Sequence, residues 1–380
     1  MRLLAPPAPR LPSSLVRSYS SPVRLGHDEL EAAILGGALL GGGGGGSMAE
    51  GRRLGHAALA AGMPTLISWQ DLPPDALVAT VSLVGAPAAI QACVEPADHL
   101  RAWNLLAAQL DRPLAGLIGS ENGGAATING WLQSAALGVP IADAPADGRA
   151  HPTGDLGGLG LNLLPGFVSI QAVSGGSQEH GRHLEQIVRA PLAAANYLVR
   201  AAAEAAGGLV AVARNPIRAD YLGSHAAVGA VTQAIDLGLA MIAVAPRGGR
   251  AVAERACEVL AGSIVAEDTV ATLEIETRGG FDVGHARIAA LELSIWNEYL
   301  TLERDGERLA TFPDLIATID ANTGAPVTSA ELQVGRRVIV LTAPSSSLKL
   351  GAGLRIADHY APLERAIGKD ILRYISPAVE

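Results

Sequence analysis

The sequence predicts an α/β protein built from two domains. Between residues 28 and 175, segments with helical periodicity alternate with short apolar segments at βα spacing, which indicates a largely parallel sheet covered by helices. Beyond residue 262 the chain is rich in strands, with turn signals at Asp305-Gly306 and 322–324. We therefore expect an N-terminal α/β domain, 27–175, and a C-terminal α+β domain, 176–375, which ends in antiparallel β structure.

Residues 1–26 form a separate compositional block. They contain four arginines with several serines and prolines, and the first acidic residue is Asp28. Such starts resemble organelle transit peptides, and a disordered extension or an upstream start codon chosen in error is the alternative. We expect a cytoplasmic protein, or an organelle-targeted one if this segment is a transit peptide.

In the first domain, apolar spacing and punctuation by glycine and proline define each element. A helix over 27–40 leads into six consecutive glycines, and a second helix runs from Ser47 to the stop signal Gly62-Met63-Pro64. The elements expected after it are strands 65–69 and 77–84, helix 96–110, strand 114–118, helix 128–137 and strand 139–142.

The second domain is expected to start with helices and to end with strands. The elements are helix 183–206, strand 209–213, helix 226–238, and strands 269–277, 286–295, 299–303, 315–320 and 337–342. The apolar stretch 226–246 contains Gln233 and Asp236, so we interpret it as a buried helix running into a strand rather than as a membrane span.

Composition excludes several classes of function. Of the 380 residues, 49% are hydrophobic and 17% charged, which suits a soluble protein with ample core, and the net charge of −9 argues against a nucleic-acid or anionic-membrane partner. Two cysteines cannot form a disulfide framework, so a reducing compartment is expected. The expected partner is a small-molecule substrate, and a homo-oligomer stays open.

The glycine run, Gly41 to Gly46, is the first candidate site. Ser47 and Glu50 form a capping-box pattern, so backbone N–H groups are delivered to the start of a helix, which suits anion binding. The run has no Walker lysine and does not follow a strand, so no nucleotide cofactor is expected. Gly43, Gly44, Gly45 and Ser47 are therefore assigned to substrate binding, a flexible linker being the alternative.

Two polar loops follow predicted strands, and loops at the carboxyl ends of parallel strands bind ligands in α/β proteins. The first spans 121–130 and the second 143–152. The candidate catalytic residues are Glu121, Asp143, Asp147 and Arg149, and the candidate substrate-binding residues are Asn129 and His151. The carboxylates could act as acid, base or metal ligands, so a divalent metal stays open; an ordinary turn and ion pair is the alternative.

Other candidates carry less chemistry. Cys93 lies in an apolar run and is interpreted as a buried, inert thiol, and His180 and His183 as a solvated face. Asn297 and Glu298 stand out as polar residues among apolar strands. They could reach across to the first domain and bind substrate, or they could form a turn.

Taken together and in order, these segments resemble the family DUF917, associated with S-methyl thiohydantoin desulfurase. The stretches that carry the resemblance are 35–46, 84–87, 121–130, 143–152, 280–284, 297–298 and 312–316. The sequence departs from the family pattern at Thr153, where an acid is common, and after Pro87, where an acid–lysine pair is usual.

The resemblance implies an N-terminal α/β domain, a β-rich C-terminal domain, and hydrolysis at a five-membered ring such as a hydantoin. In the desulfurase reaction, water replaces a methylthio group on the ring carbon between two nitrogens. Glu121, Asp143 or Asp147 would then be the base, Arg149 or the glycine-loop amides the anchor for a substrate carboxylate, and Asn129 would orient the ring. The alternative is a non-catalytic accessory or binding subunit of a hydantoinase-type system.

Overall fold

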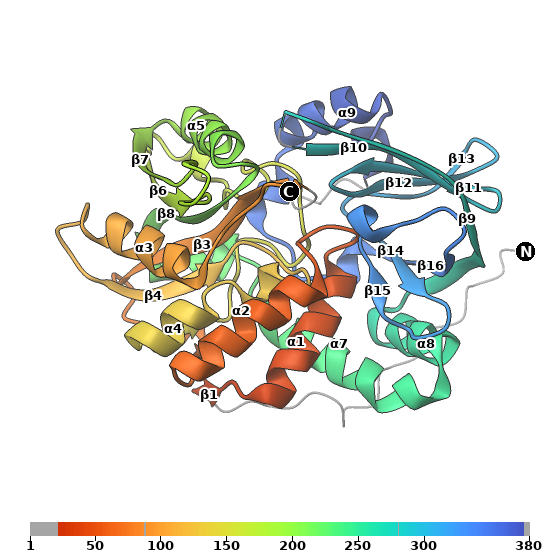
Figure 1. Ribbon diagram of the computed structural model, residues 1–380, viewed down its shortest axis with the longest axis horizontal. Coiled ribbons are helices and arrows are strands. Elements are labelled where there is room, and N and C mark those ends of the chain that lie inside the picture. Colours follow the sequence, from red (N-terminus) through yellow and green to blue (C-terminus); the bar gives the residue numbers. More distant parts are fainter. Residues whose placement is uncertain (1–21, 87–88, 280, 376–380) are drawn as a thin grey trace, which may run out of the picture.

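The computed structural model describes residues 22–86, 89–279 and 281–375, and in these ranges the chain forms two eight-stranded sheets side by side (Figure 1). Residues 1–21 of the expected extension, together with Pro87 and Gly280 of the family motifs, lie outside the described residues. The remainder of the extension is ordered, because β1 pairs with β2 and Leu25 is fully buried. The ordered domain therefore begins before residue 27.

The first sheet confirms the α/β class and is mixed rather than uniformly parallel. Its strands, in spatial order, are β1 (Val23–Arg24), β2 (Thr65–Ile67), β5 (Ile141–Ala142), β4 (Leu114–Gly119), β3 (Leu77–Gly85), β8 (Leu209–Arg218), β6 (Ser169–Gly175) and β7 (Leu184–Ala190). The four from β2 to β3 are parallel, whereas the pairings of β1, β8, β6 and β7 are antiparallel.

The expected boundary between residues 175 and 176 falls inside this sheet, since β7 and β8 come after it. The helix expected over 183–206 is also wrong in its first part. Residues 184–190 form strand β7, and α5 (Leu192–Ala205) begins only after Pro191. Proline cannot donate to a helical hydrogen bond but is well tolerated at a helix start, so it separates the two elements.

Helices cover the first sheet and fill the space beside the second. They are α1 (His27–Leu40), α2 (Met48–Ala61), α3 (Pro96–Ala107), α4 (Trp131–Leu137), α5, α6 (Leu222–His225), α7 (Ala230–Val244), α8 (Gly249–Leu260) and α9 (Ala361–Ile367). One core joins the first half of α1 to α2, α3 and α4 on the first sheet, and another joins the end of α1 to α7 and α8 on the second sheet. Helix α1 therefore links the two sheets.

Within the apolar stretch 226–246, residues 230–244 form the expected helix, α7, which packs along α1. The strand expected after it is wrong. A short turn leads instead into α8, which the sequence analysis missed. By length and composition alone, the 18 residues Ala230–Arg247 would also suit a membrane span. Helix α7 crosses α1 closely at Gly238, because any side chain there would collide with α1: a Cβ would lie 1.9 Å from the carbonyl oxygen of Ala32.

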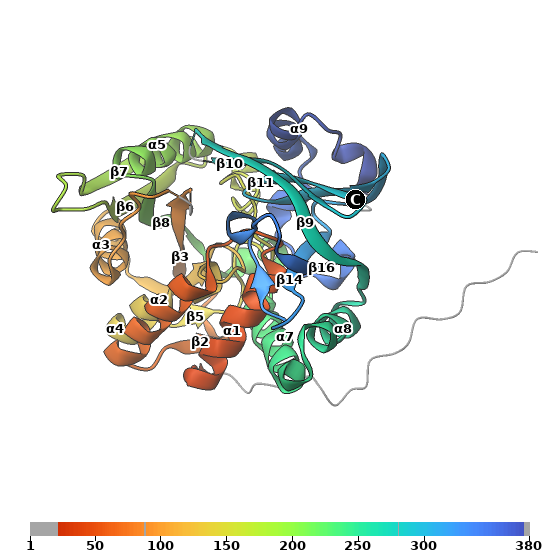
Figure 2. The ribbon, with the colours of Figure 1, turned by 45° about the vertical axis from the view of Figure 1, so that its right-hand side comes forward.

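The second sheet is antiparallel throughout, as predicted. Its strands, in spatial order, are β13 (Glu307–Thr311), β12 (Glu298–Arg304), β11 (Leu291–Trp296), β10 (Phe281–Ile288), β9 (Ser263–Arg278), β16 (Arg337–Ala343), β14 (Leu315–Asp320) and β15 (Pro326–Val327). The long, curved β9 pairs with both β10 and β16, and Figure 2 shows it arching from α8 toward α5 of the first sheet.

Candidate functional site

A cavity of about 1030 Å³ lies between the two sheets. We call it the central cavity, and its walls come from the ends of β3 and β4, from β8 and α5, and from the turns before β10 and β12. Nine of the twelve predicted site residues line it: Gly43, Gly44, Gly45, Ser47, Glu121, Asn129, His151, Asn297 and Glu298. Asp143, Asp147 and Arg149 are not among the lining residues.

The two polar loops converge because the second is tied to the end of β4. The backbone N–H of Asp147 donates to Ser120 O at 2.8 Å, and that of Ala146 donates to Gly119 O at 3.0 Å. The buried Asn122 side chain adds bonds to Gly148 O (3.2 Å) and to the start of α7. Polar groups after two neighbouring strands are thus held at one sheet edge.

His151 lies between two carboxylates. Its Nδ1 is 3.1 Å from Glu121 Oε2, which faces the cavity, and 3.5 Å from Oδ2 of the fully buried Asp147. Burial by itself lowers the pKa of His151, but the two carboxylates outweigh it and raise the pKa to about 9. Burial likewise raises the pKa values of Glu121 and Asp147, against the attraction of His151. An imidazolium thus holds the cavity carboxylate in place.

Glu298 brings a second carboxyl group to the cavity, from the start of β12. It is 2% exposed, and its Oε2 has no hydrogen-bond partner among the described residues. Burial, reinforced by the negative charge of Glu121, raises the pKa of Glu298 to about 8. At neutral pH this side chain is therefore mostly a neutral acid, able to donate a proton.

The glycine loop packs against these groups so closely that side chains would not fit. A Cβ on Gly44 would lie 2.0 Å from Glu298 Oε1, and one on Gly43 would lie 2.7 Å from the Tyr299 ring. Gly42, Gly43, Gly45 and Gly46 all have positive φ. The loop is a packed wall of the cavity, which argues against the linker interpretation.

The start of α2 bears out one half of the expected capping box. The Ser47 hydroxyl accepts from Glu50 N–H at 3.2 Å, whereas the Glu50 carboxylate pairs with Arg53 at 2.7 Å. Within the described ranges, the N–H groups of Gly45 and Gly46 donate no hydrogen bond. These residues line the cavity, where such amides favour a negative charge.

Arg149 lies beneath the glycine loop instead of in the cavity. It is fully buried, donates from Nη2 to Tyr299 O at 2.8 Å, and stacks 4.5 Å from the centre of the Phe312 ring. Its Nε and Nη1 have no partner in the described part of the chain. The expected role as a direct substrate anchor therefore does not match its position.

Asp143 is a structural residue. Its Oδ1 accepts from Val231 N–H at 2.9 Å and its Oδ2 accepts from the Thr232 hydroxyl at 2.5 Å, both in the first turn of α7. A carboxylate at a helix N-terminus satisfies free N–H groups and complements the helix dipole. The assignment of Asp143 to catalysis is not supported by this placement.

The two asparagines differ in their surroundings. Asn129 is 4% exposed, and its Oδ1 points to no protein partner within the described residues. Asn297 has φ 56°, and its side chain accepts from Asp282 N–H at 2.9 Å, so it forms the tight turn between β11 and β12. The turn interpretation of Asn297 fits this geometry, and the turn is what directs the adjacent Glu298.

Two cavity arginines were missed by the sequence analysis. Arg214 on β8 is 6% exposed and forms no salt bridge within the described ranges. Arg200 on α5 lies over the Phe281 ring at 3.8 Å and donates to Pro152 O at 3.4 Å. In the sequence, Arg214 directly follows the apolar segment 209–213, and a single arginine after an apolar strand is the one signal for it.

Cysteine and histidine candidates stay apart. Cys93, predicted to be buried, is half-buried and lines the cavity, and burial raises the pKa of its thiol. His180 and His183 contact different partners, Ser177 and Asp98. Among the described residues, no group of three or more His, Cys, Asp or Glu side chains is placed to hold a metal ion.

Comparison with known proteins gives two kinds of match. Profiles of the S-Me-THD-like N-terminal and C-terminal domains match residues 28–158 and 191–358. No curated protein matches by sequence. A crystal structure of a protein from Chromobacterium violaceum has a TM-score of 0.70 and 22% identity, and the alignment covers 94% of this chain and 99% of that one. That likeness establishes the shared fold.

Proposed function

This chain belongs to the S-Me-THD-like family, and from that premise we propose that it is a hydrolase of an S-methyl thiohydantoin-like compound or a related five-membered cyclic amide. The observation that carries the proposal is the pair of carboxyl groups, Glu121 and Glu298, which reach the central cavity from different sheets. Their surroundings differ, since the His151 imidazolium pairs with Glu121, whereas Glu298 is buried with one oxygen that has no partner among the residues that the structure describes. Such pairs divide the roles of base and acid.

In the first step, Glu121 takes a proton from water as the water oxygen attacks the ring carbon between the two nitrogens. The carbon–nitrogen double bond becomes single, and Glu298 gives its proton to that nitrogen. His151, held by Asp147, keeps the Glu121 carboxylate oriented toward the cavity. General acid–base catalysis of this kind supplies ~10²- to 10⁴-fold in rate for each group.

In the second step, the carbon–sulfur bond breaks. The ionised Glu298 takes the proton of the new hydroxyl as it becomes a carbonyl, and Glu121 returns its proton to the departing methylthiolate. The products are a hydantoin and methanethiol, and both carboxyl groups return to their starting states. For a cyclic amide, Glu298 would give its proton to the carbonyl oxygen and take one back as the carboxyl group forms, while Glu121 would give its proton to the departing ring nitrogen.

Two further groups complete the proposed site. The amides of Gly45 and Gly46 at the start of α2 are suited to the negative charge that develops on a ring oxygen. Arg214, rather than Arg149, is suited to a substrate carboxylate, because it faces the cavity without an ion-pair partner among the described residues.

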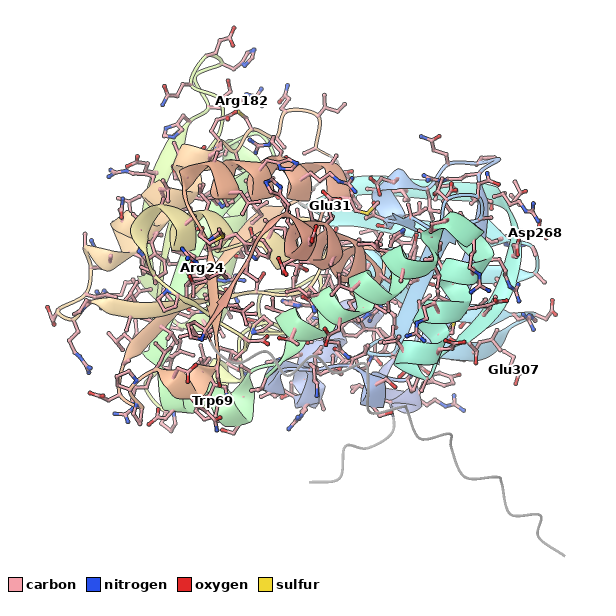
Figure 3. The ribbon with its side chains drawn as sticks, turned by 90° about the horizontal axis from the view of Figure 1, so that it is seen from below. Arg24, Glu31, Trp69, Arg182, Asp268 and Glu307 are labelled. Carbon is pink, nitrogen blue, oxygen red and sulfur yellow. The ribbon has the colours of Figure 1, made fainter. Side chains whose placement is uncertain are left out.

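The test is to incubate the purified protein with S-methyl thiohydantoins and with hydantoins while following free thiol and ring opening. We expect thiol release by the wild type and a loss of ~10²-fold or more in kcat for Glu121→Gln and for Glu298→Gln. Glu307→Gln is the matched control, since Glu307 is exposed on the edge strand β13 (Figure 3) and is not among the residues that line the cavity.

Loss of turnover in Glu307→Gln as well would point to general instability. If no ring compound is turned over, yet the wild type binds one and Glu121→Gln does not, the protein is a binding subunit. Turnover that survives in both cavity variants would overturn the proposed chemistry.

A further inference from the structure

Arg149 and Glu298 are buried on either side of the same short loop. Gly42 packs on the Arg149 guanidinium, where a Cβ would lie 2.7 Å from Nη2, and Gly44 packs on the Glu298 carboxyl group. The guanidinium also donates to the carbonyl of Tyr299, the residue that follows Glu298 in β12. The positions of the two side chains are thus linked in two ways: through the glycine loop that contacts both, and through the backbone of Tyr299, the residue after Glu298.

Both side chains have unused hydrogen-bonding capacity. Arg149 Nε and Nη1 have no partner, nor has Glu298 Oε2, in the part of the chain that the structure describes. No salt bridge joins them in the observed arrangement. Burying a guanidinium with two unpaired donors lowers the stability of the folded protein, and such unsatisfied groups are often found at functional sites.

Of the cations around Glu298, Arg149 is the one with buried donors that have no partner within the described ranges. Arg200 donates to Pro152 O at 3.4 Å and lies over the Phe281 ring. Glu298 is faced by Glu121, His151, Arg149 and Arg200, whereas Arg149 is faced by Glu298, Asp147, Asp314 and Tyr360. His151 is already held between two carboxylates, and Asp314 accepts a hydrogen bond from Ser345 N–H at 2.7 Å.

We infer that Arg149 is a positioning residue that stabilises the negative charge formed on Glu298 each time this acid gives up its proton. The neutral Glu298 of the resting site faces the cavity, and after proton transfer its negative charge is stabilised by the positive charge of Arg149 across the loop. Arg149 touches no substrate and acts only through Glu298. The inference rests on the proposed acid role of Glu298, but the charge coupling itself requires no turnover.

The first measurement is a pH titration of Glu298 by infrared spectroscopy. The band of its protonated carboxyl group is identified as the one that is absent from Glu298→Gln. With the charge removed in Arg149→Met, we expect the loss of this band to move to higher pH by ~1 unit or more, which corresponds to tenfold weaker acidity. Arg149→Lys keeps the charge and should retain most of the wild-type titration. Arg218→Gln, an exposed arginine paired with Asp220, is the control and should not change it.

The second measurement is the pH profile of kcat on any ring substrate that is turned over. Arg149→Met should lower kcat by ~10-fold or more and move the alkaline limb upward with the band. A purely structural role would lower stability while leaving both the band and the limb in place, and that result would overturn the inference. If no substrate is found, the proposed function fails while the infrared titration still decides the coupling.

A failure of Arg149→Met to fold would also be informative through the double variant with Glu298→Gln. If the charge of Arg149 compensates Glu298, the second substitution should restore folding at alkaline pH. A double variant that stays unfolded, together with a wild-type titration of the carboxyl band in the charge-removing variant Arg149→Gln, would count against the coupling.

Discussion

At the scale of single residues, the cavity depends on glycines whose lack of a side chain leaves room for neighbouring groups. Gly44 lacks a side chain at the place where the Glu298 carboxyl group lies, and its φ is not in the left-handed region. An alanine there would be acceptable to the backbone, and the three atoms nearest its Cβ would all belong to Glu298. This makes the contact between loop and acid accessible to a clean substitution.

We predict that Gly44→Ala lowers the free energy of unfolding by ~1–3 kcal/mol, the usual cost of overpacking, and abolishes turnover by displacing the Glu298 carboxyl group. The measurement is denaturant unfolding of Gly44→Ala, Glu298→Ala and the double variant. Because Glu298→Ala removes the clashing atoms, the two costs should be less than additive. Additive costs would mean that the loop is strained for another reason.

Arg214 should select for a negative charge on the ligand. Hydantoin-5-acetate and its neutral amide have nearly the same shape, and we expect the acid to bind the wild type ~10-fold or more tightly, since a charged hydrogen bond contributes ~1.5–3 kcal/mol. Calorimetry should show this preference lost in Arg214→Gln and kept in Arg218→Gln. Equal binding of acid and amide to the wild type would contradict the assignment.

At the scale of helices and strands, Asp143 was predicted to be catalytic, but its carboxylate caps the N-terminus of helix α7. It lies after β5 and binds the first turn of α7, joining the first sheet to the helix that packs on α1. Burial raises its pKa, and the bonds from Thr232 and Val231 oppose that effect. The residue is well placed to stabilise the fold and poorly placed to act on substrate.

We therefore predict that Asp143→Ala costs ~1–2 kcal/mol of stability, the range for loss of a helix cap, while leaving kcat of the folded fraction near the wild-type value. Chemical denaturation and single-turnover kinetics at low temperature would check the two parts separately. Asp268→Ala, an exposed surface change (Figure 3), is the control for stability. A large fall in kcat with unchanged stability would restore a catalytic role to Asp143.

Local patterns predicted most of the elements but not the length of α5 or the presence of α8. The segment 183–190 contains residues that tolerate either state, and its pairing with β6 is decided by a hydrogen-bonding partner that local sequence does not reveal. By contrast, the start of α2 at Ser47 follows from its own cap. Elements with their own signals were predictable, whereas those determined by neighbours were not.

At the scale of the whole molecule, the site is assembled from segments far apart in the sequence. The convergence of the loops after β4 and β5 could be predicted from the rule that parallel strands end at one sheet edge. The contribution of Arg214 could not, because it depends on β8 pairing antiparallel with β3 at Thr80. The depth of Arg149 below the glycine loop likewise depends on the second sheet, through Tyr299 and Phe312.

The assembled site also makes the stability of the whole protein depend on pH, with a definite sign. Glu298 has a pKa of about 8 in the fold against 4.5 for the free side chain, and His151 about 9 against 6.5. Both values are raised, so the folded protein binds more protons than the unfolded chain between these limits. The corresponding stability is complete below the unfolded pKa values and is lost as the pH rises through the folded ones.

We thus predict that the free energy of unfolding decreases between pH 6.5 and pH 9, measured by denaturant titration at fixed ionic strength. Below pH 6.5 the buried His99, whose pKa burial lowers to about 4, has the opposite sign and offsets the contribution of Glu298. Glu298→Gln should weaken the decrease between 6.5 and 8, and His151→Gln the decrease between 6.5 and 9, whereas Glu307→Gln should retain the full slope. Carboxyl groups with lowered pKa values, such as Glu185 and Asp320, act below this window and leave it unaffected. A slope that is the same in wild type and Glu298→Gln would mean that Glu298 is already ionised in the folded protein, and the assignment of this residue as the acid would then fail.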